Sequence, residues 1–159
     1  MSKDIILIIG ASSDIGIDLI KNIDEDALIL AHYNSSNKGL SELSNKIDKE
    51  LVMIKADLSI EDETISMIEG IENKYGIPNK IIHLAATKFE NIRFKDVKLD
   101  DFQNDLEISL KSLIIILNKF LPKLAKEKQG KVVCMLSSVV LNIPPKALTQ
   151  YTTIKYALL

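Results

Sequence analysis

Short apolar runs and amphipathic segments alternate along the whole chain. Residues 5–9, 27–31, 51–54, 80–85 and 131–136 are rich in Ile, Val, Leu and Ala. Short, nearly continuous apolar runs of this kind are typical of strands that are buried on both faces of a sheet. The pattern therefore predicts a strand at each of these places.

The segments between the runs carry apolar residues at helical spacing. Leu40, Leu43 and Ile47, for example, fall on one face of a helix over residues 38–49. By the same spacing, helices are predicted after Gly10, over 38–49, from about residue 61 toward Tyr75, from about residue 101 past Leu124, and from about Gln150.

Polar residues near two of these helices predict how the helices begin. Ser59 and Asp62 resemble a capping box for the third helix. Asp100 or Asp101 is expected to cap the long fourth helix. Pro122 is expected to kink that helix or to end its regular part, because proline removes a backbone donor.

Strands that alternate with helices predict βαβ units and a parallel sheet. Right-handed crossovers then favour a Rossmann-like, doubly wound sheet in a three-layer α/β/α arrangement, with ligands at the carboxyl ends of the strands. The chain shows no repeat, linker or low-complexity segment, so we expect a single domain over residues 1–159.

Composition narrows the class of protein further. Hydrophobic residues make up 47% of the 159 residues and the net charge is −2, which favours a globular fold and gives no argument for nucleic acid or an anionic membrane. Cys134 is the single cysteine, so a reducing, cytoplasmic compartment is expected, with Cys134 in the core. No spacing of His, Cys and carboxylates suggests a metal site.

A glycine-containing loop follows the first predicted strand. Gly10 permits a tight turn, Gly16 permits close packing of helix on sheet, and the helix N-terminus offers free N–H groups to a phosphate. The alternative is an ordinary strand-to-helix turn in which Ser13 or Asp14 caps the helix.

A second candidate site begins the last helix. Tyr151 and Lys155 are four residues apart, so both lie on one helix face, where the ammonium favours a phenolate and makes the tyrosine a usable acid or base. Ser138 ends the fifth strand at the ligand edge of the sheet. Taken singly, each residue also fits a solvated helix face or a turn.

These features together resemble the short-chain dehydrogenase/reductase family, and most closely its short, 3-oxoacyl-(acyl-carrier-protein) reductase-like branch. Residues 10–16 are similar to the family's glycine-rich loop, Asp57 to its adenine-contacting aspartate, and His83 begins a segment where the family has Asn-Asn-Ala-Gly. With the end of the second strand included, the expected cofactor-binding residues are Gly10, Ser12, Ser13, Asp14, Ile15, Gly16, His32, Asn34, Ser35, Asp57, Leu58, Ala85, Ala86, Tyr151 and Lys155.

The resemblance implies hydride transfer between a nicotinamide cofactor and a small carbonyl or alcohol. Tyr151 would then be the general acid/base, Ser138 would hydrogen-bond the substrate oxygen, and Lys155 would hold the nicotinamide ribose. Ser109 stands where the family has an asparagine that relays protons. No acid ends the second strand, where Asn34 and Ser35 could meet a 2′-phosphate, so NADP(H) is favoured and NAD(H) stays possible.

Two features keep other functions open. His83-Leu84-Ala85-Ala86 is more typical of the extended branch, which includes sugar-nucleotide dehydratases and epimerases. Leu159 lies inside the expected catalytic helix, so the domain is expected to be incomplete at its C-terminus and could be a nucleotide-binding fragment without turnover. The apolar helix over 102–124 implies, by resemblance, a homodimer or homotetramer.

Overall fold

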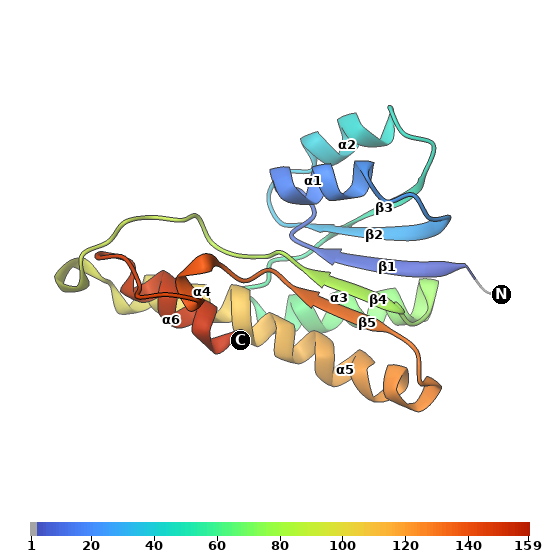
Figure 1. Cartoon of the computed structure of the whole chain (residues 1–159). Helices are drawn as coiled ribbons and strands as arrows, with labels where there is room; N and C mark the ends of the chain where they lie inside the picture. The colour runs from blue at the N-terminus through green and yellow to red at the C-terminus, as the bar shows by residue number, and fades with distance from the viewer. Residues whose placement is uncertain (1–2) are drawn as a thin grey trace.

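The computed structural model describes residues 3–159, which form a five-stranded, all-parallel sheet with the order β3-β2-β1-β4-β5 (Figure 1). This architecture confirms the predicted Rossmann-like α/β fold. The strands are β1 (Asp4–Ile9), β2 (Ala27–Tyr33), β3 (Glu50–Lys55), β4 (Lys80–His83) and β5 (Lys131–Cys134).

Helices cover both faces of the sheet, with α1 and α2 on one face and α3 and α5 on the other, while α4 and α6 lie beyond the carboxyl ends of the strands (Figure 1). None of the helices in residues 3–159 is long and apolar enough to cross a membrane. The helical segments are α1 (Asp14–Lys21), α2 (Lys38–Ser44), α3 (Glu61–Tyr75), η1 (Phe94–Asp96), α4 (Leu99–Leu106), the π-helical turn η2 (Glu107–Lys111), α5 (Ser112–Glu127), η3 (Ser138–Val140) and α6 (Thr149–Ala157).

The central strand β1 separates two apolar cores. Ile6 and Ile8 pack toward α1 and α2, and Leu7 and Ile9 pack toward α3 and α5. Successive side chains of a strand point to opposite faces, so an unbroken apolar run is what a strand between two helical layers requires. The carboxyl end of β1, where Gly10 follows, is thereby held rigidly from both sides.

The second helix is shorter than predicted, because it ends at Ser44 instead of continuing to residue 49. The Ser44 hydroxyl donates to the Ser41 carbonyl (3.0 Å), and such side-chain bonds compete with the helical backbone pattern. Beyond the helix, Lys49 reaches across to α1, where its ammonium donates to the carbonyls of Ile20, Lys21 and Ile23.

Both predicted helix caps are wrong. The Ser59 hydroxyl donates to the Asp57 carboxylate (2.7 Å), so it does not cap α3, which begins at Glu61 after Ile60. Helix α4 begins at Leu99 after Lys98, two or three residues earlier than a cap at Asp100 or Asp101 predicts. Both aspartates lie in its first turn, where carboxylates are favoured by the helix dipole.

The long fourth helix is interrupted at the π-helical turn and not at Pro122. The Ser112 amide donates to the Glu107 carbonyl, five residues earlier, and the Ser112 hydroxyl donates to the Ile108 carbonyl (2.6 Å). Pro122 lies within α5 at an exposed position, where water can solvate the carbonyl that lacks a partner.

The fifth strand is less buried than predicted. It lies at the edge of the sheet, with Val132 and Val133 exposed, and Cys134 is half-buried where a core position was expected. Burial still raises the pKa of the Cys134 thiol. Strands β4 and β5 each end two residues before the predicted limit, at His83 and Cys134.

Candidate functional site

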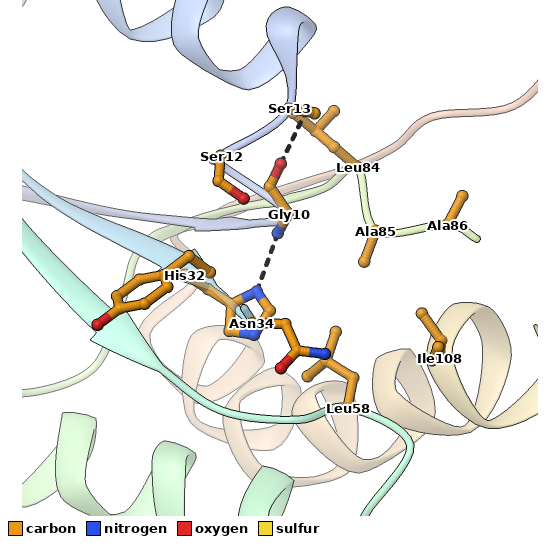
Figure 2. Close-up of a pocket in the computed structure, with 11 residues that line it drawn as sticks. Gly10, Ser12, Ser13, His32, Asn34, Leu58, Leu84, Ala85, Ala86 and Ile108 are labelled. Carbon is orange, nitrogen blue, oxygen red and sulfur yellow. Dashed lines mark hydrogen bonds between the residues drawn. The ribbon is translucent and has the colours of Figure 1, made fainter. Parts of the chain in front are cut away.

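A cavity of about 270 Å³ opens at the carboxyl ends of β1, β2 and β4 (Figure 2). The strand order reverses between β1 and β4, which are neighbours in the sheet although β2 and β3 separate them in the sequence, and such switch points are where open α/β sheets bind ligands. The cavity is lined by Gly10, Ser12, Ser13, His32, Tyr33, Asn34, Leu58, Leu84, Ala85, Ala86 and Ile108.

Two glycines are required by the backbone of the first loop. Gly10 has φ +81°, and a Cβ there would lie 2.8 Å from the Ala85 amide nitrogen. A Cβ on Gly16 would lie 2.5 Å from the Ala11 carbonyl oxygen. Neither position therefore accepts a side chain without movement of the backbone, which agrees with the roles predicted for these glycines.

Ser13 caps α1 while it lines the cavity. Its hydroxyl oxygen accepts from the Gly16 amide (3.1 Å), and its hydroxyl donates to the Gly10 carbonyl (2.9 Å). The capped turn considered as the alternative is therefore present within the glycine-containing loop. The N-terminus of α1, with its remaining free N–H groups, begins beside the cavity.

His32 joins this loop to the end of β3. It is buried, its Nδ1 accepts from the Gly10 amide (3.1 Å), and its Nε2 lies 3.1 Å from the Ala56 carbonyl oxygen. Figure 2 shows the ring beneath Gly10, next to Asn34. Burial lowers the pKa of the ring. Because both nitrogens have backbone partners, His32 has no free polar atom for a ligand.

Asp57 follows β3 and is held as a carboxylate. Its Oδ1 accepts from the amide (2.9 Å) and the hydroxyl (2.7 Å) of Ser59, and these bonds lower the pKa of the carboxyl. Its own amide donates to the Glu63 carboxylate (2.7 Å). The next residue, Leu58, lines the cavity.

Tyr151 and Lys155 come together on α6. The Lys155 Nζ lies 5.8 Å from the centre of the Tyr151 ring and donates to the Met135 carbonyl (2.8 Å). Lys155 is only 3% exposed and forms no salt bridge within residues 3–159, and burial lowers the pKa of its ammonium. Phe89 packs edge-on against Tyr151, with ring centres 5.0 Å apart.

The two predicted serines lie on segments that contact α6. Ser138 is exposed at the start of η3, and Ser109 is buried in the π-helical turn. Both segments pack beside α6. A second cavity, of about 260 Å³, borders Tyr151 between the loop 87–92 and α4.

Several predicted residues do not line the first cavity. Outside its lining are Asp14, Ile15, Gly16, Ser35, Asp57, Tyr151 and Lys155. Sequence reasoning missed Tyr33, Leu84 and Ile108. Tyr33 and Leu84 adjoin predicted residues at strand ends and could have been included, whereas Ile108 reaches the cavity only through the packing of the π-helical turn.

The residues present fit a dinucleotide. Gly10 and Gly16 keep the loop clear of side chains, the N-terminus of α1 suits a diphosphate, and Lys155 is a buried cation without an acidic partner. Within the described part of the chain, no group of three or more His, Cys, Asp or Glu residues could hold a metal ion.

Comparison with known families decides the assignment. Residues 4–159 match the sequence profile of the family described as short chain dehydrogenase. The chain belongs to the short-chain dehydrogenase family. Members of this family are oxidoreductases that bind NAD(P).

Curated members of the short-chain dehydrogenase family are similar at low identity. An NADPH-dependent pterin aldehyde reductase from Arabidopsis thaliana is 25% identical over 134 residues, which are 83% of this chain and 55% of the relative. The 3-oxoacyl-(acyl-carrier-protein) reductase FabG of Buchnera aphidicola is 21% identical over 99% of this chain and 64% of its own length. The chain thus spans between half and two thirds of the length of these two relatives.

Solved short-chain dehydrogenase structures share the fold. A short-chain dehydrogenase from Streptomyces avermitilis superposes with a TM-score of 0.87 at 16% identity, over 99% of this chain and 57% of the other. A gluconate 5-dehydrogenase from Burkholderia cenocepacia, in complex with NADP and tartrate, has a TM-score of 0.83 at 15% identity, over 99% and 62% of the two chains.

Proposed function

We propose that this chain is the cofactor-binding and proton-transferring part of an NADP(H)-dependent reductase that converts a small carbonyl compound to an alcohol. The observation that carries the proposal is the pair on α6. Lys155 is a buried ammonium without an acidic partner, 5.8 Å from the ring of Tyr151. An uncompensated buried charge is costly in free energy, and such groups are concentrated at functional sites.

The chemistry assigns one task to each side chain. The cofactor, when bound, supplies the hydride. The Tyr151 hydroxyl gives its proton to the substrate oxygen, so the carbonyl gains one hydride and one proton to become the alcohol. The Lys155 ammonium favours the phenolate that is left, and the Ser138 hydroxyl donates a hydrogen bond to the substrate oxygen. Ser109 is proposed to hold water that returns a proton to Tyr151.

The end of β2 supports NADP(H) over NAD(H). No acidic residue follows Tyr33 there, and Asn34 and Ser35 are exposed amide and hydroxyl groups that can bond a 2′-phosphate. The NADPH-dependent reductase among the relatives and the NADP complex among the structures add weak support. By resemblance to the family, we also propose that the enzyme works as a homo-oligomer in the cytoplasm.

Calorimetric titration with NADP⁺ and with NAD⁺ tests the cofactor, and NADPH oxidation by a panel of aldehydes and ketones tests the reaction. Tyr151→Phe is expected to abolish turnover and to leave the Kd for NADP⁺ within about twofold, because only the transferable proton is removed. Undiminished turnover in this variant would remove Tyr151 from the mechanism.

Two results would point to the alternatives. Tight retention of NAD together with binding of UDP- or TDP-sugars would favour a sugar-nucleotide dehydratase or epimerase. Binding of NADP⁺ without turnover of any carbonyl compound would favour a nucleotide-binding role.

A further inference from the structure

A continuous series of hydrogen bonds links the end of β3 to the start of α1. The Gly16 amide donates to the Ser13 hydroxyl oxygen, and that hydroxyl donates to the Gly10 carbonyl. The Gly10 amide donates to His32 Nδ1, and His32 Nε2 lies at bonding distance from the Ala56 carbonyl oxygen. The His32 ring is the only side chain in this series that bridges two strand ends.

The partners of His32 determine its protonation state. The Gly10 amide can only donate, so Nδ1 must be unprotonated, and the Ala56 carbonyl can only accept, so Nε2 must carry the hydrogen. Only the neutral Nε2–H tautomer satisfies both contacts. A proton on Nδ1 would face the Gly10 N–H and break the bond to the loop.

The loop has little freedom to adapt to such a change. Gly10 has φ +81°, and Ala85 lies so close behind it that even a Cβ has no room. The Ala11 amide is also bonded to the His32 carbonyl (2.9 Å). A shift of the His32 ring would therefore move the backbone that forms the wall of the cavity.

We propose that neutral His32 is a positioning residue that holds the first loop in its phosphate-binding shape, so that protonation of His32 weakens NADP(H) binding. The proposal rests on the proposed function for its ligand. It differs from direct contact, because a protonated histidine that touched a 2′-phosphate would strengthen binding as the pH falls.

The charged groups around His32 set the pH at which this occurs. Burial lowers the pKa of His32 below 6.5, and the negative charge of Asp57 beyond β3 opposes that shift. Burial lowers the pKa of His83, at the end of β4, to about 4, so His83 is neutral at pH values well above 4. Tyr33 lines the same cavity, and Lys55 beside it on β3 is exposed to solvent.

The first test needs no ligand. Ring-nitrogen NMR of the ¹⁵N-labelled chain should show His32 as the neutral Nε2–H tautomer at pH 7, titrating below pH 6.5. The protein has two histidines, so His83→Gln assigns the signals. An Nδ1–H tautomer, or a His32 pKa at or above 6.5, would overturn the proposal whatever the chain binds.

The second test measures the Kd for NADP⁺ by calorimetry from pH 8 down to one pH unit below the His32 pKa that the NMR titration gives. The 2′-phosphate also gains a proton in this range, so the matched control is His32→Asn, whose Oδ1 replaces the Nδ1 acceptor but cannot titrate. Relative to this control, the wild-type affinity should fall by about tenfold per pH unit below the His32 pKa. A relative affinity that is constant or that rises on acidification would refute the positioning role.

A third variant separates the hydrogen bond from the volume of the ring. His32→Leu has a side chain of similar volume but no acceptor for the Gly10 amide, and it should weaken NADP⁺ binding about tenfold at pH 8, where His32→Asn binds nearly as well as wild type. Equal losses in the two variants would contradict the proposal. A wild-type chain that binds no NADP⁺ at all would reject the proposed function and with it the ligand part of this inference, whereas the tautomer measurement would still decide the structural part.

Discussion

Lys155 combines complete burial with a charge that no acidic side chain neutralises in the described part of the chain. Its ammonium has one hydrogen-bond partner, the Met135 carbonyl. Removal of a desolvated charge from such a place is often neutral or stabilising when an apolar residue of similar volume replaces it.

Lys155→Met should therefore separate stability from function. We expect the free energy of unfolding in urea to stay unchanged or to rise by about 1 kcal/mol, while carbonyl reduction is lost and NADP⁺ binding weakens. A loss of stability of more than about 2 kcal/mol would mean that the ammonium serves the fold through its bond to the Met135 carbonyl, since hydrogen bonds of charged groups contribute about 1.5–3 kcal/mol.

At this scale the sequence predicted some residues better than others. The pair of Tyr151 and Lys155 could be predicted, because a fixed spacing on one helix determines which side chains share a face. The bridging role of His32 could not be predicted, because its two partners, Gly10 and Ala56, come close to it only when the carboxyl ends of three strands align in the folded sheet.

The helices of this protein depend on contacts that come from elsewhere in the chain. The Lys49 ammonium, from a residue that precedes β3, donates to the last two carbonyls of α1, those of Ile20 and Lys21, and to the Ile23 carbonyl just beyond the helix, at distances of 2.6 to 2.9 Å. A cap supplied across 26 to 29 positions leaves no local signal, so reasoning from neighbouring residues cannot predict it.

Lys49→Met should lower the free energy of unfolding by about 1–2 kcal/mol, because two carbonyls at the negative end of α1 and the Ile23 carbonyl beyond it lose a charged donor. The neighbouring exposed Lys46 provides the control: Lys46→Met should change stability by less than about 0.5 kcal/mol. Chemical denaturation of the two variants measures the difference, and equal effects would show that the capping bonds contribute nothing.

Two glycines on helices allow a paired test of the loop. An alanine at Gly16 would place its Cβ 2.5 Å from the Ala11 carbonyl, whereas an alanine at Gly70 in α3 would meet nothing within 4 Å. Gly16→Ala should weaken NADP⁺ binding at least about tenfold, the loss expected when a backbone contact to phosphate is displaced.

Gly70→Ala should leave that Kd unchanged and should raise stability by about 0.5–1 kcal/mol, the usual gain inside an exposed helix. Calorimetric titration and urea denaturation of both variants give the two readouts. If Gly16→Ala bound NADP⁺ like the wild type, the loop would not be the phosphate site.

Across the whole molecule, the two buried histidines predict how stability depends on pH. Burial lowers the pKa of His32, and it lowers that of His83 from 6.5 to about 4, so the unfolded chain binds more protons than the folded chain below pH 6.5. The free energy of unfolding therefore falls as the pH falls. His83 alone can account for a loss of up to about 3 kcal/mol between pH 6.5 and pH 4.

Asp4 and Asp57 have lowered pKa values, so they change the free energy of unfolding only below about pH 4. The range from pH 6.5 to pH 4 therefore reports the effect of the histidines separately from that of these two carboxylates. His83→Gln keeps a donor toward the Ser112 hydroxyl but cannot titrate, and it should remove most of the dependence that His83 causes. Urea midpoints across the window provide the measurement, and a variant with the full wild-type slope would exclude His83 as the source.

Alternation of strands and helices was enough to predict the fold at this scale, because each buried run of the sheet needs helical layers on both sides. The two opposed cores follow from that pattern, whereas the order β3-β2-β1-β4-β5 was not predicted, because alternation does not determine which strands are neighbours. The break in the long helix did not follow, because no proline or glycine marks residues 107–111.

That break has a consequence for how the chain tolerates change in length. The π-helical turn contains one residue more than an α-helical path would need, and each residue of a helix adds about 100° of rotation. Deletion of one residue between 107 and 111 would remove this extra residue and restore an ordinary helix, in which Ile116, Phe120 and Leu124 keep the face that now covers the sheet. Loss of one residue from the regular part of α5 would instead rotate all the residues after it by about 100°.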